Sequence, residues 1–495
     1  MKTRRLLCAV LLALTVLTVG AQQRIPCLRD IPERGAKTRG FLGYPNQDWD
    51  PQRIYRQLVV LITFLDTDFS MDDPVAYYQR LLNEPGYNEG YGVGSVADYF
   101  RDQSGGRFNL QFDVYGPFQV EQNAKNGKEL NYGVTAMNDA IKSLMASTDI
   151  DYSLYDWDGD NVVEQVLFIA AGPCGNHVAG HIWPNTGSFG TFSRVTFDMS
   201  SITCEMWSDS TSCGIGTICH EFSHCLGLPD LYPTVNDDFS VVDEWDLMDG
   251  GNYTNKGWCP PNFSATSKML MGWGQPIELT GPATITGMKP VSEGGETYII
   301  RNSGNENEYY ILENRRQTNW DSGIPGQGLV IFHVDYDREM WSNNQVNSVK
   351  THYRYDLFHA DGMDYRAWDP ANNGKDMNKY TMDNWMRNRY LSTSVYPYAD
   401  SFLVNQSLTD DSEPNASVYT VNADGVNLMS KPITNIRMAD DGTISFDFMK
   451  DPTGINKVMI DATENTYFDL QGRRLQGRPA RKGIYIRNNR KEVIK

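Results

Sequence analysis

The sequence has 495 residues with a formal net charge of -18, and 40% of its residues are hydrophobic. This length suggests roughly two to four domains with buried cores, and the composition excludes a chain that is disordered throughout. The acidic balance argues against a nucleic-acid partner, because phosphate contacts need a basic field.

The first 21 residues have the pattern of a secretory signal peptide. Lys2, Arg4 and Arg5 precede an apolar run over 6–19, and small residues follow it up to Ala21. This run is shorter than a membrane-spanning helix requires, and no other stretch offers one. We therefore expect an exported protein, secreted or associated with the cell surface, of an oligomeric state that the sequence does not indicate.

Residues 22–55 are rich in proline, glycine and charge, which is typical of a short pro-segment or linker. Cys27 raises the hypothesis that its thiolate caps a metal in a latent precursor, but an ordinary cysteine is favoured because no wider switch motif surrounds it. Without Cys8, seven cysteines remain. Six of them could pair in an oxidising compartment, in a connectivity that the sequence does not give.

Predicted strands and helices alternate from residue 56 onward. The β-branched and apolar runs at 58–64 and 166–171 predict strands buried on both faces, and 107–117 alternates as a strand should. Helices are predicted near 75–83, at 95–104 with Ser95 as the cap, and around 137–145. In the last of these, Met137, Ile141, Leu144 and Met145 recur at helical spacing, and the methionines serve packing. This alternation predicts an α/β (α+β) fold.

An acidic segment precedes the second buried strand. Asp156, Asp158, Asp160 and Glu164 offer oxygen ligands for a hard cation such as calcium, with Gly159 easing the turn. The spacing departs from the EF-hand loop, and an ordinary acidic turn explains these residues equally well.

The stretch 216–230 carries the strongest chemical signal. His220 and His224 are four residues apart, so on a helix both imidazoles project from one face, with Glu221 beside them. Gly227 permits a sharp turn that brings Asp230 round as a third ligand. This pattern predicts a zinc site in which Glu221 is the general base, whereas two packing histidines would not need the extension to Asp230.

The segment W-D-L-M-D-G-G at 245–251 follows a short way downstream. In this position it suggests the methionine-containing turn that floors the metal site of metzincin proteases. Tyr253, just after it, is a candidate to assist catalysis. His177 and His181 lie in a predicted loop and His333 in a predicted strand, and none of the three is expected to be a ligand.

After residue 278 the pattern changes to short alternating segments separated by Gly, Asn and Asp turns, which predicts a β-rich, sandwich-like domain over 279–450 with an irregular insertion at 364–400. The final segment, 451–495, changes charge sign, with nine Lys or Arg and one Glu from Arg473 onward. This segment resembles the short carboxy-terminal modules of exported Bacteroidetes proteins, linked with secretion or surface placement, and a plain terminal hairpin is compatible with the same residues.

Many of these motifs occur together, in order, in the immune-inhibitor-A-type secreted bacterial metalloproteases, which the chain resembles from about 58 to 449. The resemblance rests on G-S-V-A-D-Y-F, H-I-W-P, H-E-F-S-H-C-L-G-L-P-D, L-M-D-G-G-N-Y and P-G-Q-G-L-V-I-F-H-V-D. It implies a metzincin-like zinc protease domain over 56–278, acting on protein or peptide substrates, with His220, His224 and Asp230 as ligands and Glu221 as base. Asn185 departs from the histidine expected in relatives, and the pro-region is short.

The sequence thus predicts a secreted zinc endopeptidase. The rival is a surface binding or adhesion protein on an inactive protease scaffold, which would be expected to lose Glu221 or a ligand, yet all four residues are present. A serine-hydrolase mechanism has no comparable support, because no G-x-S-x-G elbow occurs.

Overall fold

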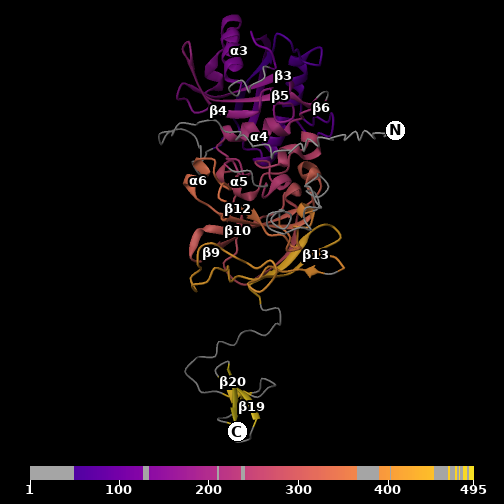
Figure 1. Ribbon diagram of the computed structural model, residues 1–495, viewed down its shortest axis with the longest axis vertical. Coiled ribbons are helices and arrows are strands. Elements are labelled where there is room, and N and C mark those ends of the chain that lie inside the picture. Colours follow the sequence, from indigo (N-terminus) through magenta and orange to yellow (C-terminus); the bar gives the residue numbers. More distant parts are fainter. Residues whose placement is uncertain are drawn as a thin grey trace, which may run out of the picture. The chain divides into compact units, whose positions relative to one another are not determined.

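The computed structural model forms two compact units, Met1–Phe448 and Met449–Lys495 (Figure 1). It describes residues 49–125, 133–208, 211–235, 240–364, 390–401 and 403–450, together with short strands between 467 and 494. The predicted signal peptide, Cys27 and most of the predicted pro-segment lie outside these residues. None of the helices described has both the length and the hydrophobicity that a membrane span requires.

A six-stranded sheet forms the centre of the first part of the larger unit. Its strands are β1 (Ile54–Thr63), β2 (Asn109–Gln119), β3 (Val162–Pro173), β4 (Asn185–Phe192), β5 (Val195–Ser208) and β6 (Thr211–Ser212). The order is β2-β1-β3-β5-β4, with β6 beside β5. The pairs β1/β2, β1/β3 and β3/β5 are parallel, whereas β4 and β6 run antiparallel to β5. The three strands predicted in this region are confirmed.

Helices cover both faces of this sheet. α3 (Val134–Ser147) packs in one apolar cluster with Leu58, Val60 and Ile62 of β1. α1 (Pro74–Asn83), α2 (Val96–Gln103) and α4 (Gly216–Cys225) belong to another cluster, with Val59 and Leu61. Because successive side chains of a strand point to opposite faces, α4 lies on the face opposite α3. The predicted helices are confirmed, and Ser95 caps α2.

The rest of the larger unit is rich in strands, as predicted. A five-stranded sheet has the order β12-β11-β10-β9-β7, and a three-stranded sheet the order β15-β16-β8. The strands are β7 (Ile277–Glu278), β8 (Ala283–Met288), β9 (Tyr298–Asn302), β10 (Asn305–Arg315), β11 (Gly328–Asp335), β12 (Tyr355–Leu357), β13 (Tyr398–Ala399), β14 (Val404–Asn405), β15 (Ile433–Met438) and β16 (Ile444–Phe448). The helices here are α5 (Ala265–Leu270) and α6 (Arg338–Ser342).

Short 3-10 turns occur in both parts of the larger unit. They are η2 (Tyr152–Tyr155), η3 (Asp243–Trp245), η4 (Gly251–Gly257), η5 (Val291–Glu293) and η6 (Asn319–Gly323).

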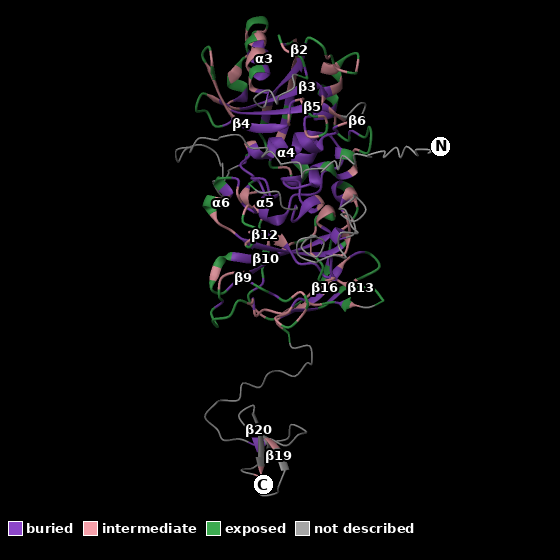
Figure 2. Ribbon diagram, in the orientation of Figure 1, coloured by how far each residue is buried: buried purple, intermediate pink, exposed green. Residues whose placement is uncertain are grey.

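One apolar cluster joins the two parts of this unit. It includes Phe222 of α4 together with Ile311 of β10 and Phe332 of β11, all fully buried. Figure 2 shows the buried residues continuing from α4 into the sheet that contains β10 and β12. The predicted boundary after residue 278 therefore falls inside one compact unit, and the sheet of the β-rich part shares its core with the helix that carries the predicted metal ligands.

The smaller unit contains one antiparallel sheet of order β18-β17-β19-β20. Its strands are β17 (Tyr467–Phe468), β18 (Arg474–Leu475), β19 (Gly483–Arg487) and β20 (Arg490–Ile494). A role of this unit in secretion or surface placement stays a prediction. Of the predicted irregular insertion, residues 365–389 lie outside the described part of the chain.

Candidate metal centre

The helix α4 is buried along its whole length from Gly216 to His224. Its first residue must be small, because a Cβ at Gly216 would lie 2.1 Å from the carbonyl oxygen of Asn252. The helix ends at Cys225, and Gly227 then adopts a φ of 105°, a conformation that other residues resist. The chain thus turns sharply where the sequence predicts, and it returns towards the helix.

This return places the three predicted ligands together. Asp230 Oδ1 lies 3.1 Å from His220 Nε2 and 3.3 Å from His224 Nε2. One ligand atom from each residue lies within 4.8 Å of the other two, and all three side chains are buried. The group can hold a metal ion.

The hydrogen bonds of the two imidazoles fit a metal site. His220 Nδ1 lies 2.8 Å from the carbonyl oxygen of Leu247, and His224 Nδ1 lies 2.7 Å from that of Leu228. A carbonyl only accepts, so each Nδ1 donates, and in the neutral ring each Nε2 keeps its lone pair for a ligand bond. His224 Nε2 is buried and makes no hydrogen bond. A cation would satisfy this buried acceptor.

The charges of the cluster also favour a cation. Burial lowers the pKa of His220, but the hydrogen bond and charge of Asp230 raise it to about 9. Burial raises the pKa of Asp230, yet the charge of His224 and the hydrogen bond and charge of His220 hold it well below its ordinary value. The carboxylate therefore stabilises positive charge at the imidazoles, which is also what a divalent ion requires.

Glu221 is buried beside this cluster and has one carboxylate oxygen without a hydrogen bond. Its Oε2 accepts a hydrogen bond of 2.8 Å from Thr186 Oγ1, whereas Oε1 is buried and makes none. Burial raises the pKa of Glu221, while the charges of His224 and His220 and the Thr186 hydroxyl act in the opposite direction. The carboxylate is thus oriented on one side and available for a proton on the other.

Thr186 is a residue that sequence reasoning missed. It is the second residue of β4, directly after Asn185. Its hydroxyl oxygen lies 2.9 Å from the backbone oxygen of Glu221 and 2.9 Å from Ser201 Oγ. A threonine in a strand does not by itself indicate a role at a metal site. The only feature of the sequence that could have drawn attention to Thr186 is its position directly after the motif Trp-Pro-Asn. Asn185 donates to the carbonyl oxygen of Trp183 at 2.6 Å.

The turn at 245–251 touches the cluster through its backbone. Leu247 supplies the carbonyl that fixes His220, and the carbonyl of Met248 accepts a hydrogen bond of 2.8 Å from Leu231 N. Asp246 Oδ1 holds the turn by accepting from Met248 N at 2.9 Å. The turn therefore supports one ligand directly, and Met248 itself is buried.

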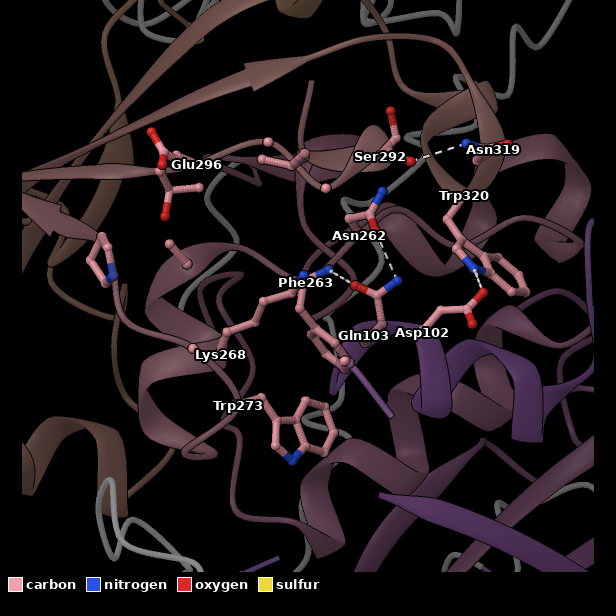
Figure 3. A pocket seen from close by; sticks show the side chains of 18 of the residues that line it. Asp102, Gln103, Asn262, Phe263, Lys268, Trp273, Ser292, Glu296, Asn319 and Trp320 are labelled. Atoms are coloured by element: carbon pink, nitrogen blue, oxygen red, sulfur yellow. Dashed lines mark hydrogen bonds between the residues drawn. The ribbon is translucent and has the colours of Figure 1, made fainter. Parts of the chain in front are cut away.

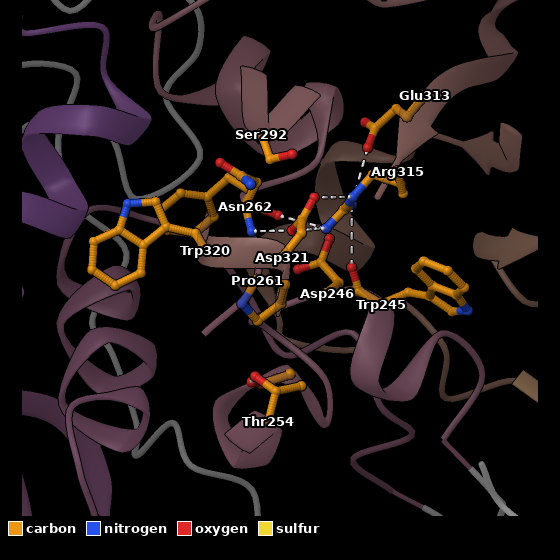
Figure 4. A network of polar contacts seen from close by, with 12 residues as sticks. Trp245, Asp246, Thr254, Pro261, Asn262, Ser292, Glu313, Arg315, Trp320 and Asp321 are labelled. Carbon is orange, nitrogen blue, oxygen red and sulfur yellow. Dashed lines mark hydrogen bonds and ion pairs between the residues drawn. The ribbon is translucent and has the colours of Figure 1, made fainter. Parts of the chain in front are cut away.

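A buried arginine ties this turn to the β-rich part (Figure 4). Arg315 of β10 forms hydrogen bonds of 2.7 and 2.9 Å with the two carboxylate oxygens of Asp321, and one of 3.1 Å with Glu313. It also donates to the carbonyl oxygen of Trp245 at 3.4 Å. The two ion pairs, whose three side chains are all buried, hold the guanidinium in place within the β-rich part, and its bond to Trp245 links it to the turn.

Tyr253 contacts the loop after β3 and the end of β5. Its hydroxyl accepts a hydrogen bond of 3.0 Å from Asn176, and its ring lies 5.9 Å from the ring of His177 and 5.7 Å from that of Trp207. The side chain is 39% exposed. A catalytic role of Tyr253 stays a prediction. His181 Nδ1 lies 3.1 Å from the carbonyl oxygen of Val178, and His333 Nε2 lies 2.9 Å from Glu308.

The acidic turn brings Asp156, Asp158 and Glu164 together, while Asp160 lies outside this group. Asp156 accepts from three backbone N–H groups of the turn, and both oxygens of Glu164 accept from Trp157 N. These bonds explain the acidic residues as turn-forming groups without a cation. The calcium interpretation gains no support from them.

A cavity of about 500 Å³ lies elsewhere, between α2, α5 and η6 (Figure 3). Lys268 and Trp273 line it, and burial lowers the pKa of Lys268. None of the predicted ligands, nor Glu221 or Tyr253, lines this cavity. It is therefore separate from the metal cluster.

None of the six cysteines that the structure describes belongs to the group of His220, His224 and Asp230. Among the residues that the structure describes, no disulfide is formed, and Cys219 is a buried thiol on α4. Cys174 Sγ and Cys213 Sγ lie 3.4 Å apart.

Known proteins resemble the region just described. Residues 185–273 match the family model described as immune inhibitor A peptidase M6, catalytic domain. The chain is 24% identical over 270 residues to the pre-pro-metalloprotease PrtV of Vibrio cholerae, covering 47% of this chain and 29% of that protein. It is 23% identical over 300 residues to immune inhibitor A of Bacillus thuringiensis subsp. alesti, covering 48% of this chain and 41% of that protein. The matches thus span less than half the length of these curated relatives.

Proposed function

Because the chain belongs to the immune inhibitor A-type metalloproteases, we propose that it is a secreted, zinc-dependent endopeptidase that hydrolyses peptide bonds of protein substrates. The observation that carries the proposal is the buried group of His220, His224 and Asp230 beside a glutamate with an unpartnered oxygen. Secretion is supported by the signal-peptide pattern of the first 21 residues.

Zinc is the metal that suits these residues best. Two imidazole nitrogens and one carboxylate oxygen are ligands of the kind that zinc prefers, and three protein ligands leave a fourth position for water or substrate, as in catalytic sites. When bound, the metal supplies Lewis acidity, which lowers the pKa of water and polarises a substrate carbonyl.

Glu221 supplies the proton transfers in this proposal. Its Oε1 takes a proton from the attacking water and later delivers it to the amine that leaves when the peptide bond breaks. Thr186 holds Oε2 at 2.8 Å, so the carboxylate does not need to reorient during the reaction. His220 and His224 are kept in one orientation by the carbonyls of Leu247 and Leu228.

The test is a digestion assay on purified mature protein with a quenched fluorescent protein substrate. We expect cleavage that a zinc chelator abolishes and that one equivalent of zinc restores, with metal analysis on the same sample. A protein that binds one zinc ion but cleaves no protein or peptide library would contradict the enzyme and favour the binding or adhesion alternative.

Thr186→Val is expected to shift the acidic limb of the pH profile of kcat/KM upward by about one pH unit. The hydroxyl stabilises the ionised Glu221, so its loss raises the pKa of that carboxyl, and the base becomes active only at higher pH. Thr191→Val is the matched control, because Thr191 lies on the same strand but is exposed, and its hydroxyl bonds that of Thr196. An unshifted limb in Thr186→Val would show that the hydroxyl does not tune the base.

A further inference from the structure

Asp230 is held by a residue that lies 114 positions away in the sequence. Asp230 N donates a hydrogen bond of 2.6 Å to Asn344 Oδ1, and Asn344 Nδ2 donates one of 2.8 Å to Asp230 Oδ2. Both residues are buried. One carboxamide thus grips the backbone and the side chain of the same residue.

This two-point contact selects which carboxylate oxygen faces the histidines. Asn344 occupies Oδ2, and the other oxygen, Oδ1, is the one that lies 3.1 and 3.3 Å from the two Nε2 atoms. Without the amide donor, the carboxylate would be free to rotate about its terminal bond, whose energy profile is broad. Asn344 therefore sets the orientation that a ligand at this position needs.

Neighbouring residues also connect the segment that carries Asp230 with the segment that carries Asn344. Thr234 Oγ1 donates to the carbonyl oxygen of Asn344 at 2.5 Å. Asn347 Nδ2 lies 2.7 Å from the carbonyl oxygens of both Leu231 and Tyr355, and Tyr355 belongs to β12 at the edge of the five-stranded sheet. A continuous set of hydrogen bonds therefore connects the β-rich part to the chain segment that carries Asp230.

The backbone at Asn344 explains why asparagine stands there. Its φ is 54°, in the left-handed region, which asparagine tolerates better than most residues other than glycine. The segment that follows α6 can therefore turn at this residue and still present a carboxamide to Asp230.

We propose that Asn344 is a positioning residue for the third metal ligand, so that the β-rich part of the chain completes the metal centre. This inference rests on the metal-dependent function proposed above. It predicts that Asn344 affects the metal affinity and the ligand geometry, beyond any effect on folding.

The test compares full-length wild type with Asn344→Gly and Asn344→Asp. Glycine removes the carboxamide without backbone strain at positive φ, whereas aspartate keeps the size but cannot donate and places a second carboxylate against Asp230. Asn435→Gly is the matched control, because Asn435 also has a positive φ, 53°, and also bonds an aspartate, Asp447, but at the surface.

We expect both Asn344 variants to bind zinc about 10- to 100-fold more weakly in chelator competition, as for other residues that orient ligands. The visible spectrum of the cobalt-substituted protein should change as well, while Asn435→Gly matches wild type in both measurements. Thermal melting of the metal-free proteins measures folding separately from metal binding. If Asn344→Gly impairs folding, Asn344→Asp provides a second variant for the test.

Zinc affinity within threefold of wild type and an unchanged cobalt spectrum in either folded Asn344 variant would overturn the inference. Failure of the wild type itself to bind one zinc ion would instead overturn the proposed function. The two outcomes are therefore distinguishable.

Discussion

Glu221→Gln is expected to lower kcat/KM for a protein substrate by about 10²- to 10⁴-fold, the range of general-base catalysis, while one zinc ion stays bound. Glutamine keeps the size of the side chain and can still accept the hydrogen bond from Thr186. It cannot accept a proton at the atom that replaces Oε1. The loss should therefore appear in kcat rather than in metal binding.

The measurement is steady-state kinetics on the wild type and the variant, with metal analysis of both. Glu308→Gln is the matched control, because Glu308 is also a fully buried glutamate but accepts from Tyr419 N and Thr420 N in the β-rich part. It should retain the activity of the folded wild type, although its stability will fall. A Glu221→Gln protein with nearly full activity would mean that another group is the base.

Asp230→Ala is expected to weaken zinc binding by more than about 100-fold, since changes in residues that only orient ligands already cost 10- to 100-fold. The substitution removes one of three ligands together with the negative charge that the cluster places beside two imidazoles. Proteolysis should be lost at ordinary zinc concentrations.

Metal analysis after gel filtration, followed by chelator competition, measures this effect. Asp160→Ala is a suitable control, because Asp160 is an exposed carboxylate outside both groups of possible metal ligands. Undiminished zinc affinity in Asp230→Ala would place the third ligand elsewhere. A loss of zinc in Asp160→Ala would point to a distant effect of the acidic turn.

Local patterns account for what could be predicted. The β-branched run of β1 and the helical spacing of Met137, Ile141 and Leu144 determined their elements, because each depends on the period of nearby residues. The share of strands after residue 278 followed from alternation and turn residues in the same way. The packing of both parts around one core could not be predicted in this way, since contacts between distant segments leave no periodic pattern in the sequence.

The same distinction between short-range patterns and long-range contacts applies to the residues of the candidate metal centre. The spacing of residues was enough to predict that His220 and His224 share a helix face and that Gly227 turns the chain back to Asp230, because these relations span only a few residues. The contacts of Thr186 with Glu221 and of Asn344 with Asp230 are seen only in the three-dimensional structure. Those contacts depend on how β4 and the segment after α6 pack around α4. The partners are 35 positions apart for Thr186 and Glu221 and 114 positions apart for Asn344 and Asp230, and no local pattern in the sequence links residues at such separations.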